Sequence, residues 1–182
     1  MKIVVSNSTI ASDPERMLRF VRAISDDMAF LRESYPAFDE WLLDKALPGI
    51  YAGERTAVME LRDSTVAGLL IVKHTDTEKK LCTLRVRPDF ESKGLGVRLF
   101  ETAFDLLGTD RPLLSVSEPL LPKFSRLFTH FGFSKEAVYG GRYQPHVDEF
   151  SYNGYLEPLW VPHVGITEVS ALRREARQLQ HA

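Results

Sequence analysis

The sequence holds few of the features that would tie a protein to a metal, a membrane or an oxidising compartment. Its single cysteine, Cys82, excludes an internal disulfide and is typical of a reducing compartment. The five histidines are scattered without ligand-like spacing, so we expect no metal. The longest apolar run, 66–72, is too short to span a bilayer, and the first residues are too briefly apolar for a signal peptide. We therefore expect a cytoplasmic protein without a membrane role.

Neither sign of charge is in excess. The chain has 23 Lys and Arg and 25 Asp and Glu, and this net charge of −2 argues against a dedicated nucleic-acid binder. Its 182 residues suit one domain, which at this size can bury a core without a disulfide or a metal. We assign residues 1–160 to that domain. Residues 161–182 form a tail in which we expect a short amphipathic helix.

Hydrophobic spacing predicts helices near the N-terminus. After a first strand at Lys2–Ser6, Ser12 and Glu15 have the spacing of a capping box. Apolar residues follow at helical intervals as far as Leu31. A second helix is predicted over Phe38–Ala46, where it should end before a Pro-Gly pair.

Period-two alternation then predicts an antiparallel meander of three strands, at 56–61, 65–74 and 81–87. Next come a helix to Leu107, a short buried strand, a helix and a final strand pair. The last four elements are predicted at 112–117, 122–131, 133–139 and 149–156. Strands interleaved with helices predict an α/β fold with a mixed sheet and a crossover helix.

A glycine-bearing loop after the meander opens a helix, which is the geometry of an anion site. Gly94 and Gly96 carry no Cβ, so a ligand can approach the backbone there. The first amides of the following helix have no internal partner, so a phosphate or diphosphate would be held by main-chain groups. The loop is neither a Walker loop nor a dinucleotide fingerprint. Short Gly-x-Gly loops also occur as plain turns between a strand and a helix.

Two stretches resemble the GNAT superfamily of N-acetyltransferases. The sequence Leu-Arg-Val-Arg-Pro at 84–88, followed by Lys-Gly-Leu-Gly-Val at 93–97, is similar to the family's acetyl-CoA diphosphate loop. Residues 127–133 are similar to its later helix ending in Gly-Phe, and the element order agrees. The resemblance implies a GNAT-like mixed sheet with an antiparallel meander, splayed central strands and flanking helices. It also implies an enzyme that transfers acetyl from acetyl-CoA to a primary amine of a small molecule or peptide.

The resemblance further implies which positions meet the cofactor. Main-chain bonds to the pantetheine arm would fall on Leu84 and Val86, and Phe128 would lie close by on the later helix. The diphosphate would be held by the backbone of one continuous run: Glu91, Ser92, Lys93, Gly94, Leu95, Gly96 and Val97.

Two positions depart from the family's pattern. Glu91 stands where Gln or Arg is usual, and a carboxylate beside a diphosphate is unfavourable. Lys93, Arg98 or Arg87 could offset it, although we expect the side chain to face water. Phe128 stands where many relatives carry a Tyr that protonates the departing thiolate, but it also fits its helix's apolar stripe as a core residue. Losing an acid costs about 10²–10⁴ in rate, yet a thiol of pKa about 8.5 is a good leaving group.

Candidate acids and bases are spread over several predicted strands. The candidate bases are Glu60, Glu118, Asp148 and Glu149, and the candidate acids are Tyr139, Tyr143 and Tyr152. For each one the alternative is a solvated carboxylate, a salt bridge or ordinary strand packing. The departures at Glu91 and Phe128 also leave a second hypothesis open, an acyl-CoA-binding module without turnover. A homodimer is compatible with either function.

Overall fold

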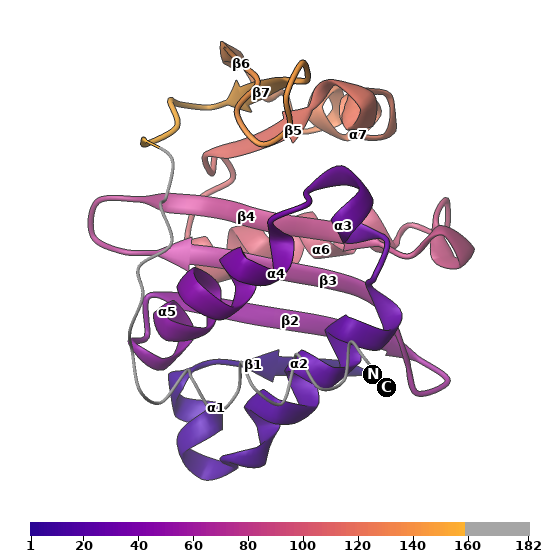
Figure 1. Cartoon of the computed structure of the whole chain (residues 1–182), viewed down its shortest axis with the longest axis vertical. Coiled ribbons are helices and arrows are strands. Elements are labelled where there is room, and N and C mark those ends of the chain that lie inside the picture. Colours follow the sequence, from indigo (N-terminus) through magenta and orange to yellow (C-terminus); the bar gives the residue numbers. More distant parts are fainter. Residues whose placement is uncertain (159–182) are drawn as a thin grey trace.

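The computed structural model describes residues 1–158, whose strands form two sheets that meet side by side (Figure 1). The first is an antiparallel meander in the order β1-β2-β3-β4, made of Lys2–Val5, Arg55–Arg62, Thr65–His74 and Lys79–Val86. The second has the order β5-β7-β6, made of Leu114–Ser117, Asp148–Tyr152 and Lys135–Gly140. The predicted meander is confirmed, whereas the predicted tail helix lies outside the described residues.

Helices cover both faces of the meander (Figure 1). The N-terminal helices lie on one face: α1 (Asn7–Ser12), α2 (Glu15–Asp27), α3 (Leu31–Ser34), α4 (Phe38–Trp41) and α5 (Leu47–Tyr51). The other face carries α6 (Leu95–Leu107), with α7 (Leu121–His130) packed beside it. No helix within residues 1–158 is both long and apolar enough to cross a membrane.

Two apolar cores follow from this layering, one on each face. Strand β3 supplies both, because successive side chains point to opposite faces of a sheet. Leu69 and Ile71 pack with the N-terminal helices, while Leu70 and Val72 pack with α6 residues such as Leu99, and all are fully buried. A strand buried on both faces needs a continuous apolar run, which explains why this strand was predicted with its observed bounds.

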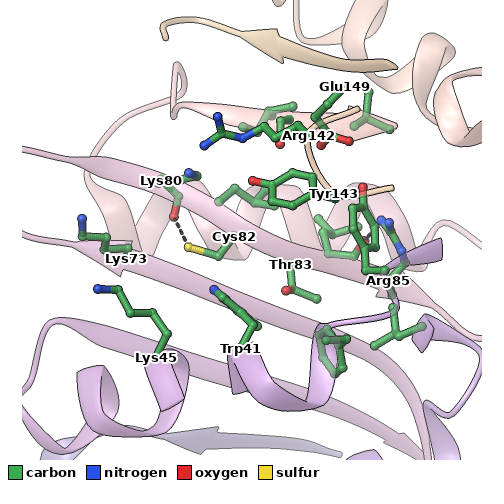
Figure 2. A pocket seen from close by; sticks show the side chains of 18 of the residues that line it. Trp41, Lys45, Lys73, Lys80, Cys82, Thr83, Arg85, Arg142, Tyr143 and Glu149 are labelled. Atoms are coloured by element: carbon green, nitrogen blue, oxygen red, sulfur yellow. Dashed lines mark hydrogen bonds between the residues drawn. The ribbon is translucent and has the colours of Figure 1, made fainter. Parts of the chain in front are cut away.

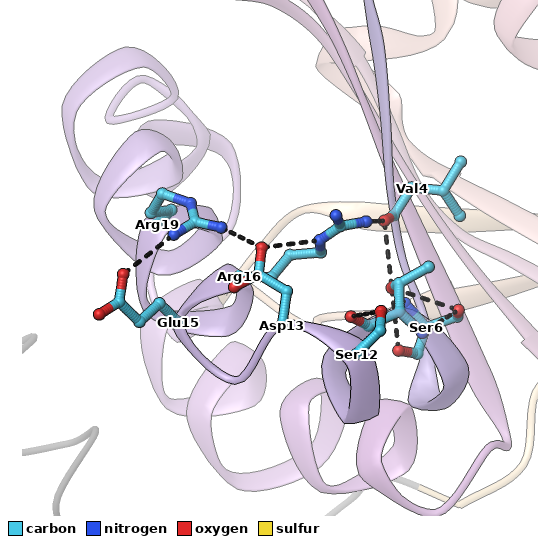
Figure 3. Close-up of polar contacts among 8 residues, drawn as sticks. Val4, Ser6, Ser12, Asp13, Glu15, Arg16 and Arg19 are labelled. Carbon is cyan, nitrogen blue, oxygen red and sulfur yellow. Dashed lines mark hydrogen bonds and ion pairs between the residues drawn. The ribbon is translucent and has the colours of Figure 1, made fainter.

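The start of the chain differs from the prediction. Helix α1 was not expected, and its N-cap is Ser6, whose side chain forms a capping box with Thr9 (Figure 3). Ser12 therefore ends α1 rather than capping α2, and its Oγ donates to the carbonyl of Thr9 at 3.0 Å. Asp13 between the helices pairs with Arg16 and Arg19. The observed helix α2 is also shorter than predicted, because it ends at Asp27 and not near Leu31.

The second predicted helix runs further than expected. A π-helical turn at Leu42–Ala46 follows α4, and α5 continues past the Pro-Gly pair to Tyr51. Pro48 lies at the start of α5, where the amide it lacks would have no intrahelical partner. Leu47 and Ile50 are fully buried, so core packing outweighs the local breaker signal.

Strands β4 and β5 are joined only where they begin. After the α6 crossover β5 runs parallel to β4, and the two strands meet at one bridge between Lys80 and Leu113. The amide of Leu81 donates to the carbonyl of Leu113 at 2.9 Å, and the amide of Leu113 donates to Lys79 at 3.0 Å. Beyond the bridge no ladder connects them within the described residues, so the predicted splay of the central strands is confirmed.

Candidate active site

A cavity of about 670 Å³ occupies the gap between β4 and β5 (Figure 2). Thr83–Arg85 of β4 and Leu114–Val116 of β5 form its two edges. Phe100 and Phe128 reach it from the α6 side, and Tyr35, Trp41 and other residues of the N-terminal helices reach it from the opposite side. The cavity therefore extends between the two layers of helices, and residues from both faces of the sheet line it.

A bulge in β4 decides which peptide groups face the gap. Val72 pairs with Leu81 but the adjacent Ile71 pairs with Thr83, so Cys82 is an extra residue in the strand. The amide of Leu81 points to β5, yet the amide of Arg87 points to β3, where it donates to Ala67 at 2.9 Å. Without the bulge these two odd-numbered residues would point the same way.

Because of that bulge, Leu84 and Val86 turn their amides and carbonyls toward the gap. They are the two positions at which the family resemblance implied main-chain bonds to a pantetheine arm. The Leu84 carbonyl accepts a hydrogen bond from Arg85 Nη1 at 2.9 Å. Leu84 lines the cavity, and Val86 follows along the same strand edge.

The glycine loop keeps its amides free. Gly94 has a left-handed backbone (φ 72°), Ser92 has φ 61°, and no side chain caps α6. Within residues 1–158 the amides of 92–97 have no hydrogen-bond acceptor; the next amide, that of Arg98, reaches the Gly94 carbonyl at 3.3 Å. These amides lie outside the cavity lining. Gly96 lies against Leu127 of α7, the helix whose Phe124 and Phe128 line the cavity, so loop and cavity share one wall.

The side chain of Glu91 was expected to face water, but it also forms an ion pair. Its carboxylate pairs with Lys123 at 3.0 Å, a residue of α7 that is remote in sequence. Lys93 instead donates to the carbonyl of Asp89, and Arg87 pairs with Asp27 and Asp89. The tertiary contact between the loop and α7 thus supplies a counter-charge that sequence proximity could not identify.

Phe128 is a buried wall of the cavity and is 4% exposed. Its ring lies 4.4 Å from Tyr152, stacks on Phe124 and meets Phe100 edge-on. Phe128 is therefore both a core residue, as its helical position predicted, and part of the cavity wall. Its side chain has no proton to donate.

Glu149 is the predicted base that the structure brings into the cavity. It lies on β7 opposite Ser117, is 2% exposed, and its Oε1 has no hydrogen-bond partner within the described residues. Burial raises the pKa of its carboxyl to about 7, although Ser115 and the charges of Arg85, Arg142 and Lys80 act in the opposite direction. A carboxyl group with a pKa near neutrality can accept a proton at physiological pH.

Three other predicted catalytic residues lie elsewhere. Glu60 is buried on the α6 face of β2, beside Arg62 at 3.5 Å, and Glu118 is exposed in the turn after β5. The hydroxyl of Tyr139 accepts the amide of Leu156 at 2.9 Å. None of the three lines the cavity, so none is placed to exchange a proton with a molecule bound there. Side chains alternate along β2, so Glu60 lies on the same face as Val58, which packs in the α6 core. The Glu60 side chain therefore points away from the cavity lining.

Tyr143 of the β6–β7 loop, one of the candidate acids, does line the cavity, whereas Tyr35 was not expected there. Tyr35 follows α3, and its ring meets that of Tyr143 edge-on at a centroid distance of 5.7 Å. Gln144 of that loop donates to the carbonyls of Glu33 and Ser34, so the two segments close over the cavity together. Burial raises the pKa of the Tyr35 hydroxyl, and Arg85 opposes the shift. No periodic pattern in the sequence marks a residue such as Tyr35, because its place depends on contacts with a segment far away in the chain.

The fold can be compared with solved structures. A protein from Desulfovibrio desulfuricans that is assigned to the GNAT family of acetyltransferases superposes with a TM-score of 0.54 at 21% identity. The match covers 84% of this chain and 97% of that one. The chain has the GNAT acetyltransferase fold.

Other acetyltransferase structures are similar at lower TM-scores. The ribosomal-protein-S18-alanine N-acetyltransferase of Escherichia coli gives 0.48 at 20% identity, over 59% of this chain and 76% of that one. An acetyltransferase of Bacillus subtilis in complex with CoA gives 0.48 at 18% identity, over 65% and 91%. No protein-family model and no curated protein matches the sequence. The fold is shown by the superposition with the Desulfovibrio desulfuricans protein.

Proposed function

We propose that this protein is an acetyl-CoA-dependent N-acetyltransferase in which an amine attacks the thioester directly. The observation that carries the proposal is the cavity between β4 and β5, which holds a buried carboxyl group with a pKa of about 7. In a protein without a ligand at this place, β5 could pair with β4 along its whole length, and the backbone groups of both strand edges would then be hydrogen-bonded. The gap leaves those groups free for a ligand.

The described residues fit the acyl donor at three points. The free amides of 92–97 begin α6, and the partial positive charge of its N-terminus suits a diphosphate. Leu84 and Val86 present amides and carbonyls to the gap, which suits the amide groups of a pantetheine arm. The rings of Phe100, Phe124 and Phe128 provide an apolar wall. Acetyl-CoA supplies the activated acetyl group and a thiol leaving group.

Glu149 would act as the base. As the amine nitrogen bonds to the acetyl carbon and the carbon–sulfur bond breaks, the proton lost by nitrogen passes to the Glu149 carboxylate, directly or through one water. The departing sulfur needs one proton, which solvent can supply because a thiol of pKa about 8.5 leaves readily without an acid. Phe128 is thus compatible with turnover at a reduced rate.

The decisive test is the release of free thiol from acetyl-CoA in the presence of an amine panel, measured across pH. Activity needs the ionised carboxylate and a neutral amine, so kcat/KM, expressed per neutral amine, should rise with pH and level off above an apparent pKa near 7. Glu149→Gln should lower kcat about 10²–10⁴-fold and leave acetyl-CoA affinity unchanged. Glu118→Gln is the matched control, since Glu118 is exposed outside the cavity.

Two results would count against this assignment. Equal rates for Glu149→Gln and the unaltered protein would remove Glu149 as the base. Thermal stabilisation by acetyl-CoA without thiol release from any amine would favour the binding module instead.

A further inference from the structure

Charged side chains are unevenly paired in the half of the cavity that faces the N-terminal helices. Six basic and five acidic residues line the cavity among those described. Two of the acids form salt bridges with Lys73, whose Nζ lies 2.5 Å from the Glu78 carboxylate and 3.7 Å from that of Glu157. Glu40 and Glu54 are exposed, which leaves Glu149 as the one buried acid without a salt bridge among the described lining residues.

The basic residues deeper in the cavity lack such partners. Arg55 is 5% exposed, and its Nη1 donates to Cys82 Sγ at 3.3 Å rather than to a carboxylate. Arg142 has a buried Nε without a hydrogen-bond partner. Lys80 and Arg85 likewise form no salt bridge within residues 1–158, so the interior carries positive charge that the described protein does not neutralise.

These cations converge on the base. Lys80 from β4, Arg85 from the same strand and Arg142 from the β6–β7 loop all act on Glu149, although none pairs with it. Figure 2 shows them around the space that also holds Trp41 and Tyr143. Arg55 is buried and the other three cations are half-buried, so water solvates their charges incompletely, and a bound anion would compensate them.

We propose that the acceptor is a small amine that carries its own carboxylate, with a free α-amino acid as the simplest case. This inference rests on the proposed acetyltransfer. A polyamine or an aminoglycoside brings only positive charge and would be repelled by Arg55, Lys80 and Arg142. The carboxylate of an amino acid would pair with these cations while its amine faces Glu149. The same positive field favours the neutral, nucleophilic form of the bound amine.

The size of the cavity supports a small acceptor. About 670 Å³ lies within the ordinary range for small-molecule sites, and the apolar half is needed for the acyl donor. The Tyr35–Tyr143 contact and the hydrogen bonds of Gln144 cover the polar half.

The test compares each L-amino acid with its own C-terminal amide as acceptor, at saturating acetyl-CoA, with spermidine as a cationic reference. At least one amino acid should exceed its amide about tenfold or more in kcat/KM, the worth of one charge-assisted hydrogen bond. Lys80→Gln should raise KM for that acid about tenfold and leave both KM for the amide and acetyl-CoA affinity unchanged. Lys79→Gln is the matched control, because Lys79 is adjacent but does not line this cavity.

Calorimetry provides a readout without turnover. With CoA bound, the N-acetyl amino acid should bind at least tenfold more tightly than its amide, and Lys80→Gln should abolish that difference. If spermidine or the amides turn over as well as the acids, the inference is overturned while the proposed acetyltransfer stands. If no amine releases thiol although acetyl-CoA binds, both ideas fail together.

Discussion

A carboxyl group changes its chemistry with its surroundings, and Glu149 and Glu118 demonstrate this within one chain. Both are glutamates at an end of a predicted strand, Glu118 just after 112–117 and Glu149 at the start of 149–156, so nothing in the sequence favoured one over the other as the base. In the fold Glu118 is exposed, whereas Glu149 is buried by the pairing of β7 with β5 and β6. Burial raises the pKa of Glu149 to about 7, which makes it the one proposed base.

The Glu91–Lys123 pair sets the charge beside the proposed diphosphate site. Glu91→Gln should tighten acetyl-CoA binding about two- to fivefold, because it removes a negative charge and frees Lys123 to face the phosphates. Lys123→Gln should weaken binding by a similar factor, since the carboxylate loses its counter-charge. These modest effects reflect a half-exposed pair at 3.0 Å.

Titration calorimetry at low and high salt would measure both effects, which should shrink as salt screens the charges. The double variant should bind close to the unaltered protein. Tighter binding in Lys123→Gln would mean that Glu91 has a role other than repulsion.

At the scale of elements, helix α6 begins and ends on a left-handed glycine. Gly94 precedes its first residue with φ 72°, and Gly108 follows its last with φ 65°. A side chain at either position is strained by about 1–2 kcal/mol, because L residues rarely adopt this backbone. The two glycines differ in what surrounds them, since only Gly94 is next to the free amides.

Gly94→Glu and Gly108→Glu should therefore lower stability by similar amounts but affect cofactor binding differently. We expect Gly94→Glu to weaken acetyl-CoA binding by at least tenfold, because bulk and charge would obstruct the amides of 92–97, and Gly108→Glu to leave it unchanged. Denaturant unfolding and calorimetry on the same samples separate the two effects. Full affinity in a folded Gly94→Glu would remove the loop from the proposed site.

The bulge in β4 is the second decisive element. One extra residue, Cys82, reverses the direction of every later peptide group in the strand, and so directs Leu84 and Val86 to the gap. The sequence offered no sign of it, because Cys82 lies in an uninterrupted apolar alternation. The positions implied by the family resemblance agree with the geometry only through this bulge.

At the scale of the whole molecule, one parallel bridge joins the two sheets, and a ligand in the gap would join them again. Acetyl-CoA at 100 times its Kd should stabilise the protein by about 2.7 kcal/mol, or about 5–10 °C in Tm. Amide exchange should slow most at 84–86 and 114–117, where the strands part, and little in α2. Uniform protection, or none in those strands, would contradict a ligand between β4 and β5.

Local patterns determined the order of elements, the meander, the bounds of β3, the end of α6 and the glycine loop, because periodicity and backbone freedom act over neighbouring residues. Tertiary structure decided the rest. Helix α5 continues past Pro48 because Leu47 and Ile50 are buried in the core. Glu60 points away from the cavity, whereas Glu149 is buried near Arg85 and Arg142. Glu91 pairs with Lys123 of a distant helix. Each of these depends on contacts between segments far apart in the chain, whose charge and burial exist only once the sheets have met.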